Sequence, residues 1–263
     1  MFKRISQRTM SSIASYADKH TLALEHYTPC DVADALVKYG LPHGGYIPNL
    51  VQYSKNRTDA AAAAPATAVG RAYTVLYAPL DDPRPAVKGG YIDTAPAGAI
   101  VVIGTAAAVQ TGGMAPYTRI SNALYGGLMS TRAQYLGCKG SVILGKIRDV
   151  AEHNALGYPV FAYGLGTSAP TKVVKVVAVN EPLEVQVPAQ GSDNAVDVRV
   201  INPGDYIAAD ENGVVVIPAQ DPAFVDKVLA AIPPRVEADE LVAEDIKTGV
   251  PAGQAQKTRR AGL

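Results

Sequence analysis

Residues 141–163 read SVILGKIRDVAEHNALGYPVFAY, and this stretch decides the fold class. Two short apolar runs, at 141–145 and 159–163, have the length and composition of strands that are buried on both faces. The more polar residues between them predict a helix from about 149 to 156. Strand, helix and strand in this order indicate an α/β fold whose strands are joined by crossover connections.

The chain before this stretch continues the same pattern. Residues 99–104 are wholly apolar and end in glycine, which again indicates a buried strand. Thr28 can cap a short helix that Pro29 opens and Gly40 ends. The elements expected here are a helix at 28–40, a surface loop or short irregular helix at 54–67, strands at 72–80 and 99–104, and a helix at 122–137.

The chain after residue 170 changes to closely spaced β-rich runs that are separated by turn signals such as NPGD and ENG. This pattern predicts a mostly antiparallel sheet or a partial barrel. The last 45 or so residues return to helical patterns and end in a polar, basic tail that we expect to fray. The expected strands are 172–180, 183–187, 196–201, 206–210 and 214–217, the helices are 222–231 and 236–247, and the tail is 254–263.

Composition excludes several classes of function. The 263 residues are 48% hydrophobic, which is enough for a substantial core, and 24 basic residues balance 24 acidic ones. A net charge of zero gives no general attraction to nucleic acid or to an anionic membrane, so neither is expected as a partner. No apolar run approaches the roughly 20 residues that span a bilayer.

Cysteine usage and the N-terminus bear on the compartment. Cys30 and Cys138 are too few for a disulfide framework, which indicates a reducing, cytoplasmic setting. Residues 1–17 contain three basic residues and no acidic one, a composition that resembles a mitochondrial transit segment. A disordered N-terminal extension is the interpretation favoured here, because the amphipathic pattern of these residues is weak.

Arg148 and Asp149 carry the strongest chemical signal, because they follow a buried strand at the point where the next helix begins. Ligands in layered α/β folds commonly bind at this end of the strands. Arginine offers a planar, permanently charged fork for a carboxylate or an enolate oxygen. Aspartate is a hard oxygen ligand that suits Mg²⁺ or Mn²⁺. Taken alone, however, Asp149 with Glu152 three residues later also fits a helix N-cap with its reciprocal partner.

The spacing around Arg148 resembles a pattern of the RraA-like family, to which the class II 4-hydroxy-4-methyl-2-oxoglutarate aldolases belong. Gly127 precedes Arg148 by twenty intervening residues, and Arg148-Asp149-x-x-Glu152 follows, which is similar to the family's Gly-x20-Arg-Asp-x2-Glu/Asp. Other segments that resemble the family are CDVADAL at 30–36, LGYPVFA at 156–162, NPGD at 202–205 and ADENGVVVIP at 209–218.

This resemblance covers about residues 26–250 and implies a domain organisation. Residues 26–250 would form a single RraA-like layered α/β domain, with a mixed sheet or partial β-barrel and flanking helices. Residues 1–25 would form a flexible N-terminal extension, and residues 251–263 a polar C-terminal tail.

The resemblance also implies roles for individual residues. The backbone amides of Gly126, Gly127, Leu128 and Met129 would hold the carboxylate of the substrate. Arg148 would bind the 2-oxo acid and stabilise the developing enolate. These assignments agree with elementary chemistry, because amides at the start of a helix lack intrahelical partners and favour anions.

The implied cofactor is a divalent metal, with Mg²⁺ first and Mn²⁺ as the alternative, and Asp149 would be its ligand. Glu152 would help to organise metal-bound water. Aldolases of the family often carry aspartate at the position of Gly127, so glycine here favours oxaloacetate decarboxylation over aldol cleavage. The catalytic residues implied are therefore Arg148, Asp149 and Glu152.

Two further groups of residues are candidates for the site. The histidines have no metal-ligand spacing, and we expect His153 on the surface of its helix. The loop at 164–172 either borders the pocket or is a plain turn. The histidines are His20, His26, His43 and His153.

The expected activity is that of a metal-dependent lyase that converts oxaloacetate to pyruvate and also cleaves 4-hydroxy-4-methyl-2-oxoglutarate to pyruvate. The alternative is an RraA-type regulator that acts by binding another protein. The resemblance further implies a homotrimer or hexamer, in which a C-terminal carboxylate of a neighbouring subunit approaches the metal. The acids available for this are Glu237, Glu240 and Glu244.

Overall fold

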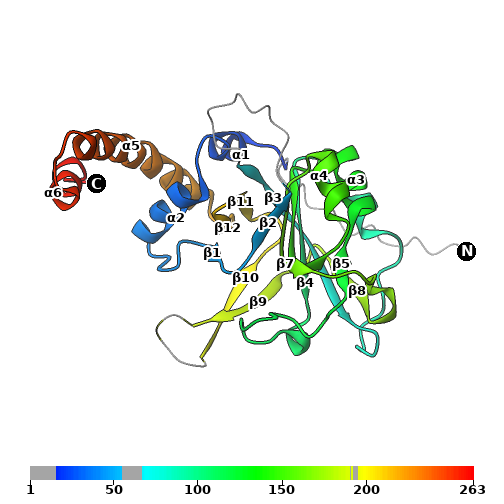
Figure 1. The fold of residues 1–263 in the computed structure, drawn as a ribbon. Coiled ribbons are helices and arrows are strands. Elements are labelled where there is room, and N and C mark those ends of the chain that lie inside the picture. The colour runs from blue at the N-terminus through cyan, green and yellow to red at the C-terminus, as the bar shows by residue number, and fades with distance from the viewer. Residues whose placement is uncertain (1–15, 55–66, 190, 192–194) are drawn as a thin grey trace, which may run out of the picture.

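A ten-stranded mixed sheet forms the centre of the fold in the computed structural model, which describes residues 16–54, 67–189, 191 and 195–263 (Figure 1). Four parallel strands at its middle are β3, β4, β6 and β7, and antiparallel strands flank them. The strand order is β1-β12-β11-β3-β4-β6-β7-β2, with β5 paired to β6 and β8 to β3. The bounds are β1 Tyr46–Ile47, β2 Val51–Ser54, β3 Ala68–Pro79, β4 Ala99–Thr105, β5 Ala123–Tyr125, β6 Gly140–Ile147, β7 Val160–Leu165, β8 Val174–Val179, β11 Tyr206–Asp210 and β12 Gly213–Ile217.

The parallel strands are the apolar runs that the sequence indicated. Every residue of β4 is buried, and so are the first six residues of β6, because helices cover one face of the sheet and other strands cover the opposite face. The predicted α/β class, with a mixed sheet and flanking helices, is confirmed. Within the described residues the strand order has two free ends, at β1 and β2, so the sheet is open rather than closed into a barrel.

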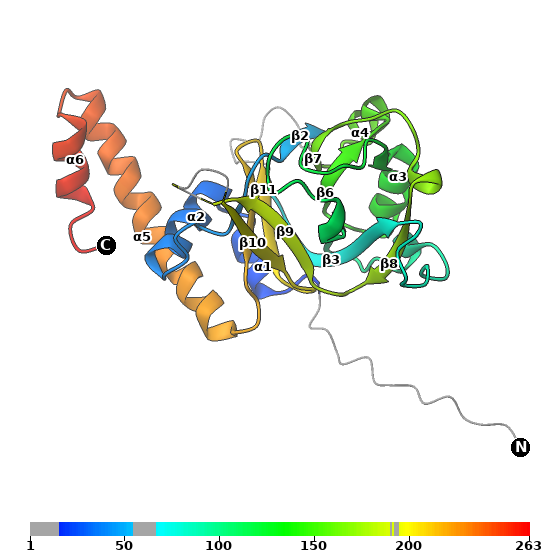
Figure 2. The same cartoon turned by 90° about the horizontal axis from the view of Figure 1, so that it is seen from below.

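The predicted antiparallel half of the chain does not form a sheet of its own. Strands β8, β11 and β12 pair antiparallel as expected, but they extend the central sheet through β3. Among the described strands, β9 (Leu183–Pro188) and β10 (Val196–Ile201) alone form a separate two-stranded ribbon (Figure 2). Leu183, Val185 and Val187 of this ribbon are buried against the face of the sheet that lies away from α3 and α4.

Helices α3 (Gly127–Tyr135) and α4 (Val150–Leu156) cover the other face of the parallel strands. The helix predicted at 122–137 begins five residues later than expected. Residues Ala123–Tyr125 instead form the short strand β5, because all three side chains are buried and the backbone pairs in parallel with β6. This difference matters for function, since it places Gly126 at the N-cap of α3.

Helices α1 (Lys19–Leu24), α2 (Pro29–Lys38) and α5 (Pro222–Lys247) pack on β11 and β12. Thr28 caps α2 as predicted, since its side-chain oxygen accepts a hydrogen bond from the Asp31 amide. The two helices predicted at 222–231 and 236–247 are one continuous helix, although it contains Pro233 and Pro234. A proline inside a helix costs roughly 3 kcal/mol, and burial of apolar side chains on both sides of the pair offsets that cost.

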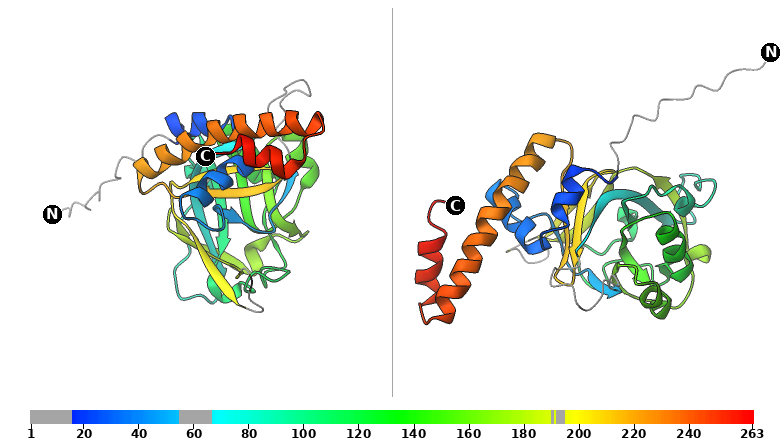
Figure 3. Two further views of the ribbon diagram at one scale, coloured as in Figure 1. Left: turned by 90° about the vertical axis from the view of Figure 1, so that its left-hand side faces the viewer. Right: turned by 90° about the horizontal axis from the view of Figure 1, so that it is seen from above.

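The C-terminal residues are more ordered than the sequence predicts. The expected fraying tail contains helix α6 (Ala252–Arg259), which folds back along α5 (Figure 3). Arg259 forms a two-pronged ion pair with Asp245, and Arg260 pairs with Asp239, so two links tie α6 to α5. In the described part of the chain, no helix combines the length and hydrophobicity that are needed to cross a bilayer.

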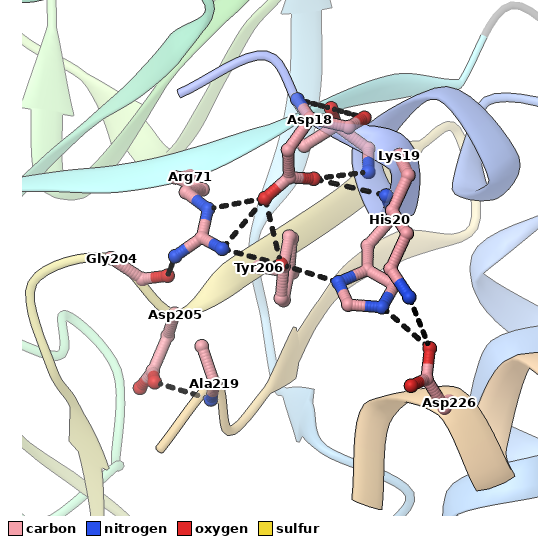
Figure 4. A network of polar contacts seen from close by, with 10 residues as sticks. Asp18, Lys19, His20, Arg71, Gly204, Asp205, Tyr206, Ala219 and Asp226 are labelled. Atoms are coloured by element: carbon pink, nitrogen blue, oxygen red, sulfur yellow. Dashed lines mark hydrogen bonds and ion pairs between the residues drawn. The ribbon is translucent and has the colours of Figure 1, made fainter. Parts of the chain in front are cut away.

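The segment expected as a flexible extension at 1–25 is folded from Tyr16 onward. Asp18 caps α1, and its carboxylate also forms an ion pair with Arg71 at 2.6 Å (Figure 4). The Tyr206 hydroxyl donates to the same carboxylate, and His20 bridges Tyr206 and Asp226 of α5. This network fastens α1 to both the sheet and α5. The predictions for residues 1–15 and 55–66 lie outside the described residues.

Candidate active site

The carboxyl end of β6 and the start of α3 meet at a hollow of about 260 Å³. Strands β5 and β6 are parallel neighbours, so the chain leaves both at one edge of the sheet, where α3 and α4 begin. The residues that were expected to bind substrate and metal and that line this hollow are Gly126, Leu128, Met129, Arg148 and Asp149. The structure thus brings together two segments that are twenty residues apart in the sequence.

Asp149 has an unusual backbone conformation and an unexpected partner. Its φ of 62° and ψ of 41° are left-handed, and its side chain makes no cap on α4. Instead, Oδ2 accepts a hydrogen bond from the Gly127 amide at 3.1 Å and lies 3.5 Å from Nε of Arg148. Asp149 does occupy the N-cap position of α4, as the cap interpretation expects, but its side chain makes no capping bond because its carboxylate faces the start of the other helix. Such left-handed residues are uncommon outside glycine and concentrate at functional sites.

Gly126 and Gly127 are required by the close approach of acidic side chains. A side chain at position 127 would overlap the carboxylate of Glu152, which crosses from α4 toward α3. A Cβ atom at position 126 would lie 2.6 Å from Oδ2 of Asp149. Glycine removes both collisions because it has no Cβ atom. Glu152 does not line the hollow, but it is exposed and lies beside it.

His153 lies beneath the turn formed by Arg148 and Asp149, and it is fully buried. The expectation that it lies on the helix surface is wrong, because the ring points inward. Its Nε2 is 2.7 Å from the carbonyl oxygen of Arg148, and its Nδ1 is 2.9 Å from Oγ of Ser130 on α3. Burial lowers the pKa of His153, so the ring is neutral at pH 7.

Tyrosines from three segments form one wall of the hollow, and sequence reasoning missed all of them. Tyr77 comes from β3, Tyr91 from the short helical turn Tyr91–Thr94, and Tyr125 from β5. Burial raises the pKa of each hydroxyl, so the wall is uncharged at neutral pH. No local motif marks these positions. The loop at 164–172 does border the hollow, through residues 169–171.

The electrostatic character of the hollow follows from this lining. Among the described residues that line it, Arg148 is the one cationic side chain and Asp149 the one acidic side chain. The side chain of Arg148 is 40% exposed and that of Asp149 is 33% exposed, so both remain accessible to a small ligand. The site therefore offers one cationic group to an anionic ligand, next to an uncharged surface.

The carboxylates at this site fit a hydrated divalent ion. Within residues that the structure describes, no group of three or more His, Cys, Asp or Glu side chains could hold a metal. Mg²⁺, however, usually keeps several waters and needs only one or two carboxylates from the protein. Asp149, with Glu152 nearby, offers such a donor set for Mg²⁺ or Mn²⁺, and it is a poor match for a closed zinc site.

The C-terminal acids lie elsewhere in the chain. Glu237, Glu240 and Glu244 line a separate surface hollow on α5 together with Lys247. Helix α5 projects from the side of the molecule opposite α3 and α4 (Figures 1 and 3). Within one chain, none of these carboxylates lines the candidate site.

Comparison with known proteins agrees with this arrangement. The family model described as RraA-like, Aldolase/RraA, matches residues 29–216. The chain belongs to the RraA-like family. The matched range contains every strand of the central sheet except the last residue of β12, and it includes both halves of the candidate site. The RraA-like family includes aldolases and RraA proteins, as its description states.

Individual relatives of this RraA-like chain are more distant. The DlpA protein of Legionella pneumophila is 29% identical over 194 residues, which are 73% of this chain and 27% of that protein. A Halalkalibacterium halodurans protein, whose name proposes a 4-hydroxy-4-methyl-2-oxoglutarate aldolase, is 35% identical over 37% of this chain and 41% of its own. The chain therefore matches between about a quarter and two fifths of these curated relatives' lengths.

A solved structure of an uncharacterised protein from Pseudomonas syringae pv. tomato has the same RraA-like fold. It superposes with a TM-score of 0.69 at 25% sequence identity, over 92% of this chain and 99% of that chain. The likeness therefore extends well beyond the matched family range, to nearly the whole chain.

Proposed function

We propose that this RraA-like protein is a divalent-metal-dependent carbon–carbon lyase that decarboxylates oxaloacetate to pyruvate. The observation that carries the proposal is the convergence of Arg148, Asp149 and the start of α3 on one hollow. A 2-oxo acid presents a carboxylate next to an oxo oxygen. A helix start and a guanidinium are suited to these two groups.

The start of α3 would bind the carboxylate next to the oxo group. The Gly127 amide already donates to Asp149, whereas the Leu128 amide has no acceptor among the described residues. Arg148 would then hold the 2-oxo oxygen, since its guanidinium lies beside the same helix start. Two neighbouring polar groups of the substrate would thus be fixed by two neighbouring parts of the protein.

The tyrosine wall would face the carboxylate that departs as CO₂. The lining offers this second carboxylate no cation of its own among the described residues. An anion without a partner is costly in such surroundings, whereas CO₂ is neutral, so loss of the charge is favoured. This wall would therefore contribute to the reaction by destabilising the charged group that leaves.

Arg148 would stabilise the charge that develops on the 2-oxo oxygen as the carbon–carbon bond breaks. A positioned cation of this kind is usually a large part of catalysis. A bound Mg²⁺ ion would supply Lewis-acid polarisation of the same oxygen. Asp149, with its exposed neighbour Glu152, would hold that ion and its waters at the edge of the hollow.

Decarboxylation suits this lining better than aldol cleavage does. It needs no base at the start, whereas a retro-aldol step must remove a hydroxyl proton. The tyrosine hydroxyls are neutral because burial raises the pKa of each, so they cannot accept that proton. Cleavage of 4-hydroxy-4-methyl-2-oxoglutarate to pyruvate would thus be the second activity of the same site.

The test is pyruvate release from oxaloacetate by the purified protein in the presence of Mg²⁺, compared with the spontaneous rate. Pyruvate release above that rate, with a smaller rate on 4-hydroxy-4-methyl-2-oxoglutarate, is the expected result. Failure to release pyruvate from any of several 2-oxo acids would contradict the proposal. Recovery of one protein partner at equal stoichiometry by an inactive chain would instead favour an RraA-type regulator.

A homotrimer or hexamer remains part of the proposal. In such an assembly a carboxylate from α5 of one subunit would approach the site of the next, as the resemblance implies. None of these acids lines the site of its own chain. Sedimentation of the purified protein would give the number of subunits, and a monomer would contradict this part.

A further inference from the structure

The buried side chain of His153 connects the two segments that form the candidate site, and the sequence motif does not include this residue. The helix start that would bind the carboxylate belongs to α3, whereas Arg148 and Asp149 belong to the turn before α4. The imidazole ring of His153 contacts both segments. Its Nδ1 lies 2.9 Å from Oγ of Ser130 on α3, and its Nε2 lies 2.7 Å from the carbonyl oxygen of Arg148.

The direction of these two hydrogen bonds follows from their partners. A carbonyl oxygen can only accept, so Nε2 carries the proton and donates to Arg148. In a neutral imidazole the other nitrogen then accepts, so the Ser130 hydroxyl donates to Nδ1. Burial of the ring favours this neutral form, and the ring also stacks on Tyr125 with 5.9 Å between centroids. The ring is therefore held in one tautomer and one orientation.

The turn that His153 supports requires such support. Asp149 has a positive φ, which costs a residue other than glycine of the order of 1 kcal/mol. The turn is held by a short list of hydrogen bonds: the Arg148 amide donates to the Tyr125 carbonyl, and the amides of Glu152 and His153 donate to the Asp149 carbonyl. Two side-chain contacts link this turn to α3: the Asp149 carboxylate accepts from the Gly127 amide, and the His153 ring connects the Arg148 carbonyl to Ser130.

We infer that His153 is a positioning residue. It holds Arg148 and Asp149 at a fixed position relative to the start of α3, where the carboxylate would bind. It does so through its Nε2–H, which fixes the backbone of Arg148. This inference rests on the proposed function for its catalytic consequence. The positioning itself depends only on the contacts of the ring.

The consequence for catalysis is specific. Loss of the Nε2–H would displace the guanidinium of Arg148 relative to the bound carboxylate, while the amides of α3 would remain available. Misplacement by about 1 Å can reduce a rate of reaction by about 100-fold. We therefore expect kcat to fall and KM to change little.

Two substitutions separate positioning from stability. His153→Phe keeps a ring that can stack on Tyr125 but removes both hydrogen bonds. His153→Gln loses the ring but places an amide N–H where Nε2 lies, so it can still donate to the Arg148 carbonyl. We expect the His153→Gln protein to melt at a lower temperature than the His153→Phe protein, because a flexible polar side chain replaces a packed ring. We expect the glutamine variant nevertheless to be the more active of the two.

The experiment measures pyruvate release, thermal melting and amide hydrogen exchange for both variants, with His26→Gln at an exposed position as the matched control. For the phenylalanine variant we expect a kcat about 100-fold below that of the parent protein. For the glutamine variant we expect a kcat within about ten-fold of the parent value, and KM should change little in both. Activities that follow the melting temperatures would overturn the inference. So would a phenylalanine variant as active as the parent protein.

Hydrogen exchange makes the inference independent of the proposed reaction. The amides of Arg148, Glu152 and His153 should exchange faster in the phenylalanine variant than in the glutamine variant. Equal exchange in the two would overturn the inference even if activity differs. A parent protein without activity on any 2-oxo acid would contradict the proposed function, and the exchange comparison would still decide the positioning.

If the phenylalanine variant does not fold, Ser130→Ala should raise exchange in the same amides, and no rise there would overturn the inference.

Discussion

Arg148 is the residue on which the proposed chemistry depends most directly. Its guanidinium is half exposed at the hollow, with its Nε beside the Asp149 carboxylate. The arrangement leaves the fork available to a ligand, because the Asp149 carboxylate is also engaged by the Gly127 amide. A residue in this position can bind the ground state weakly and the developing charge strongly, which is what raises kcat.

Replacement of Arg148 with alanine should lower the rate of pyruvate release from oxaloacetate by about 100-fold or more, the usual effect of removing one donor to a developing oxyanion. Steady-state kinetics would measure this. Arg132→Ala is the matched control, because Arg132 lies on α3, pairs with Asp93 and does not line the hollow. Equal activity of Arg148→Ala and Arg132→Ala would contradict the assigned role.

Gly127 and Glu152 form a steric pair, and their substitutions should not be additive. Gly127→Ala should destabilise the protein by about 1–3 kcal/mol, because the new methyl group overlaps the Glu152 carboxylate. Glu152→Ala should remove only part of that cost, because the collision with the carboxylate disappears while the Cβ atom of residue 152 stays 2.7 Å from the new methyl group. Urea unfolding of both single variants and the double variant would measure the coupling. Gly253→Ala in α6, where a methyl group meets open space, is the control. An uncoupled pair would show that Glu152 moves away freely.

The steric pair also limits which side chains position 127 could carry. Aspartate at position 127 and glutamate at position 152 would compete for the same space, since even a Cβ atom at 127 collides with the Glu152 carboxylate. A chain with an acid at 127 must therefore direct its residue at 152 differently. In this chain glycine stands at 127 on α3, and the acid is Glu152 on α4.

At the level of elements, α1 is fastened by charge as well as by packing. Burial alone would raise the pKa of Asp18, but hydrogen bonds from the Thr21 amide and from Arg71 and Tyr206 outweigh it, so the pKa is lowered. A lowered carboxyl pKa adds stability above the unfolded-state pKa of about 3.9, and that stability is lost as pH falls through the folded-state pKa.

Asp18→Asn should therefore destabilise the protein at pH 7 and have less effect at pH 3. Asparagine can still cap α1, so the change isolates the charge that faces Arg71. The expected loss at pH 7 is about 1–2 kcal/mol. Urea unfolding at the two pH values would measure it. An equal loss at both would mean that the charge contributes nothing.

The central elements could be predicted from sequence because their signals are local. Wholly apolar runs indicated β4 and β6, and Thr28 with Pro29 indicated the start of α2. The failures have a common cause, since they depended on tertiary contacts. Strand β5 exists because it pairs with β6, and α6 is held by ion pairs to α5.

The candidate site shows the same division. The motif located Arg148, Asp149 and the glycines, because their spacing along the chain is a sequence property. It could not show that Asp149 serves the opposite helix, that His153 turns inward, or that tyrosines from distant segments complete the wall. Those facts depend on which segments the fold brings together.

For the whole molecule, a metal should matter for activity and little for folding. The described residues contain no cluster of three or more metal-binding side chains, so the ion would add few bonds to the folded chain. Chelation should abolish pyruvate release while the melting temperature without substrate changes little. Calorimetry with and without chelator would measure the second part. Unfolding on chelation would point to a structural metal instead.

Chemistry and selectivity are encoded in different stretches of the chain. The groups proposed to react, together with His153, come from residues 126–153, one contiguous segment. Most of the opposing wall comes from Tyr77, Tyr91 and residues 169–171, which lie on either side of it. A library that varies only these wall positions would leave the reactive groups unchanged. If the proposed function holds, the architecture would offer a way for new substrates to be acquired, in the laboratory or in evolution, without changing the residues proposed to break the bond.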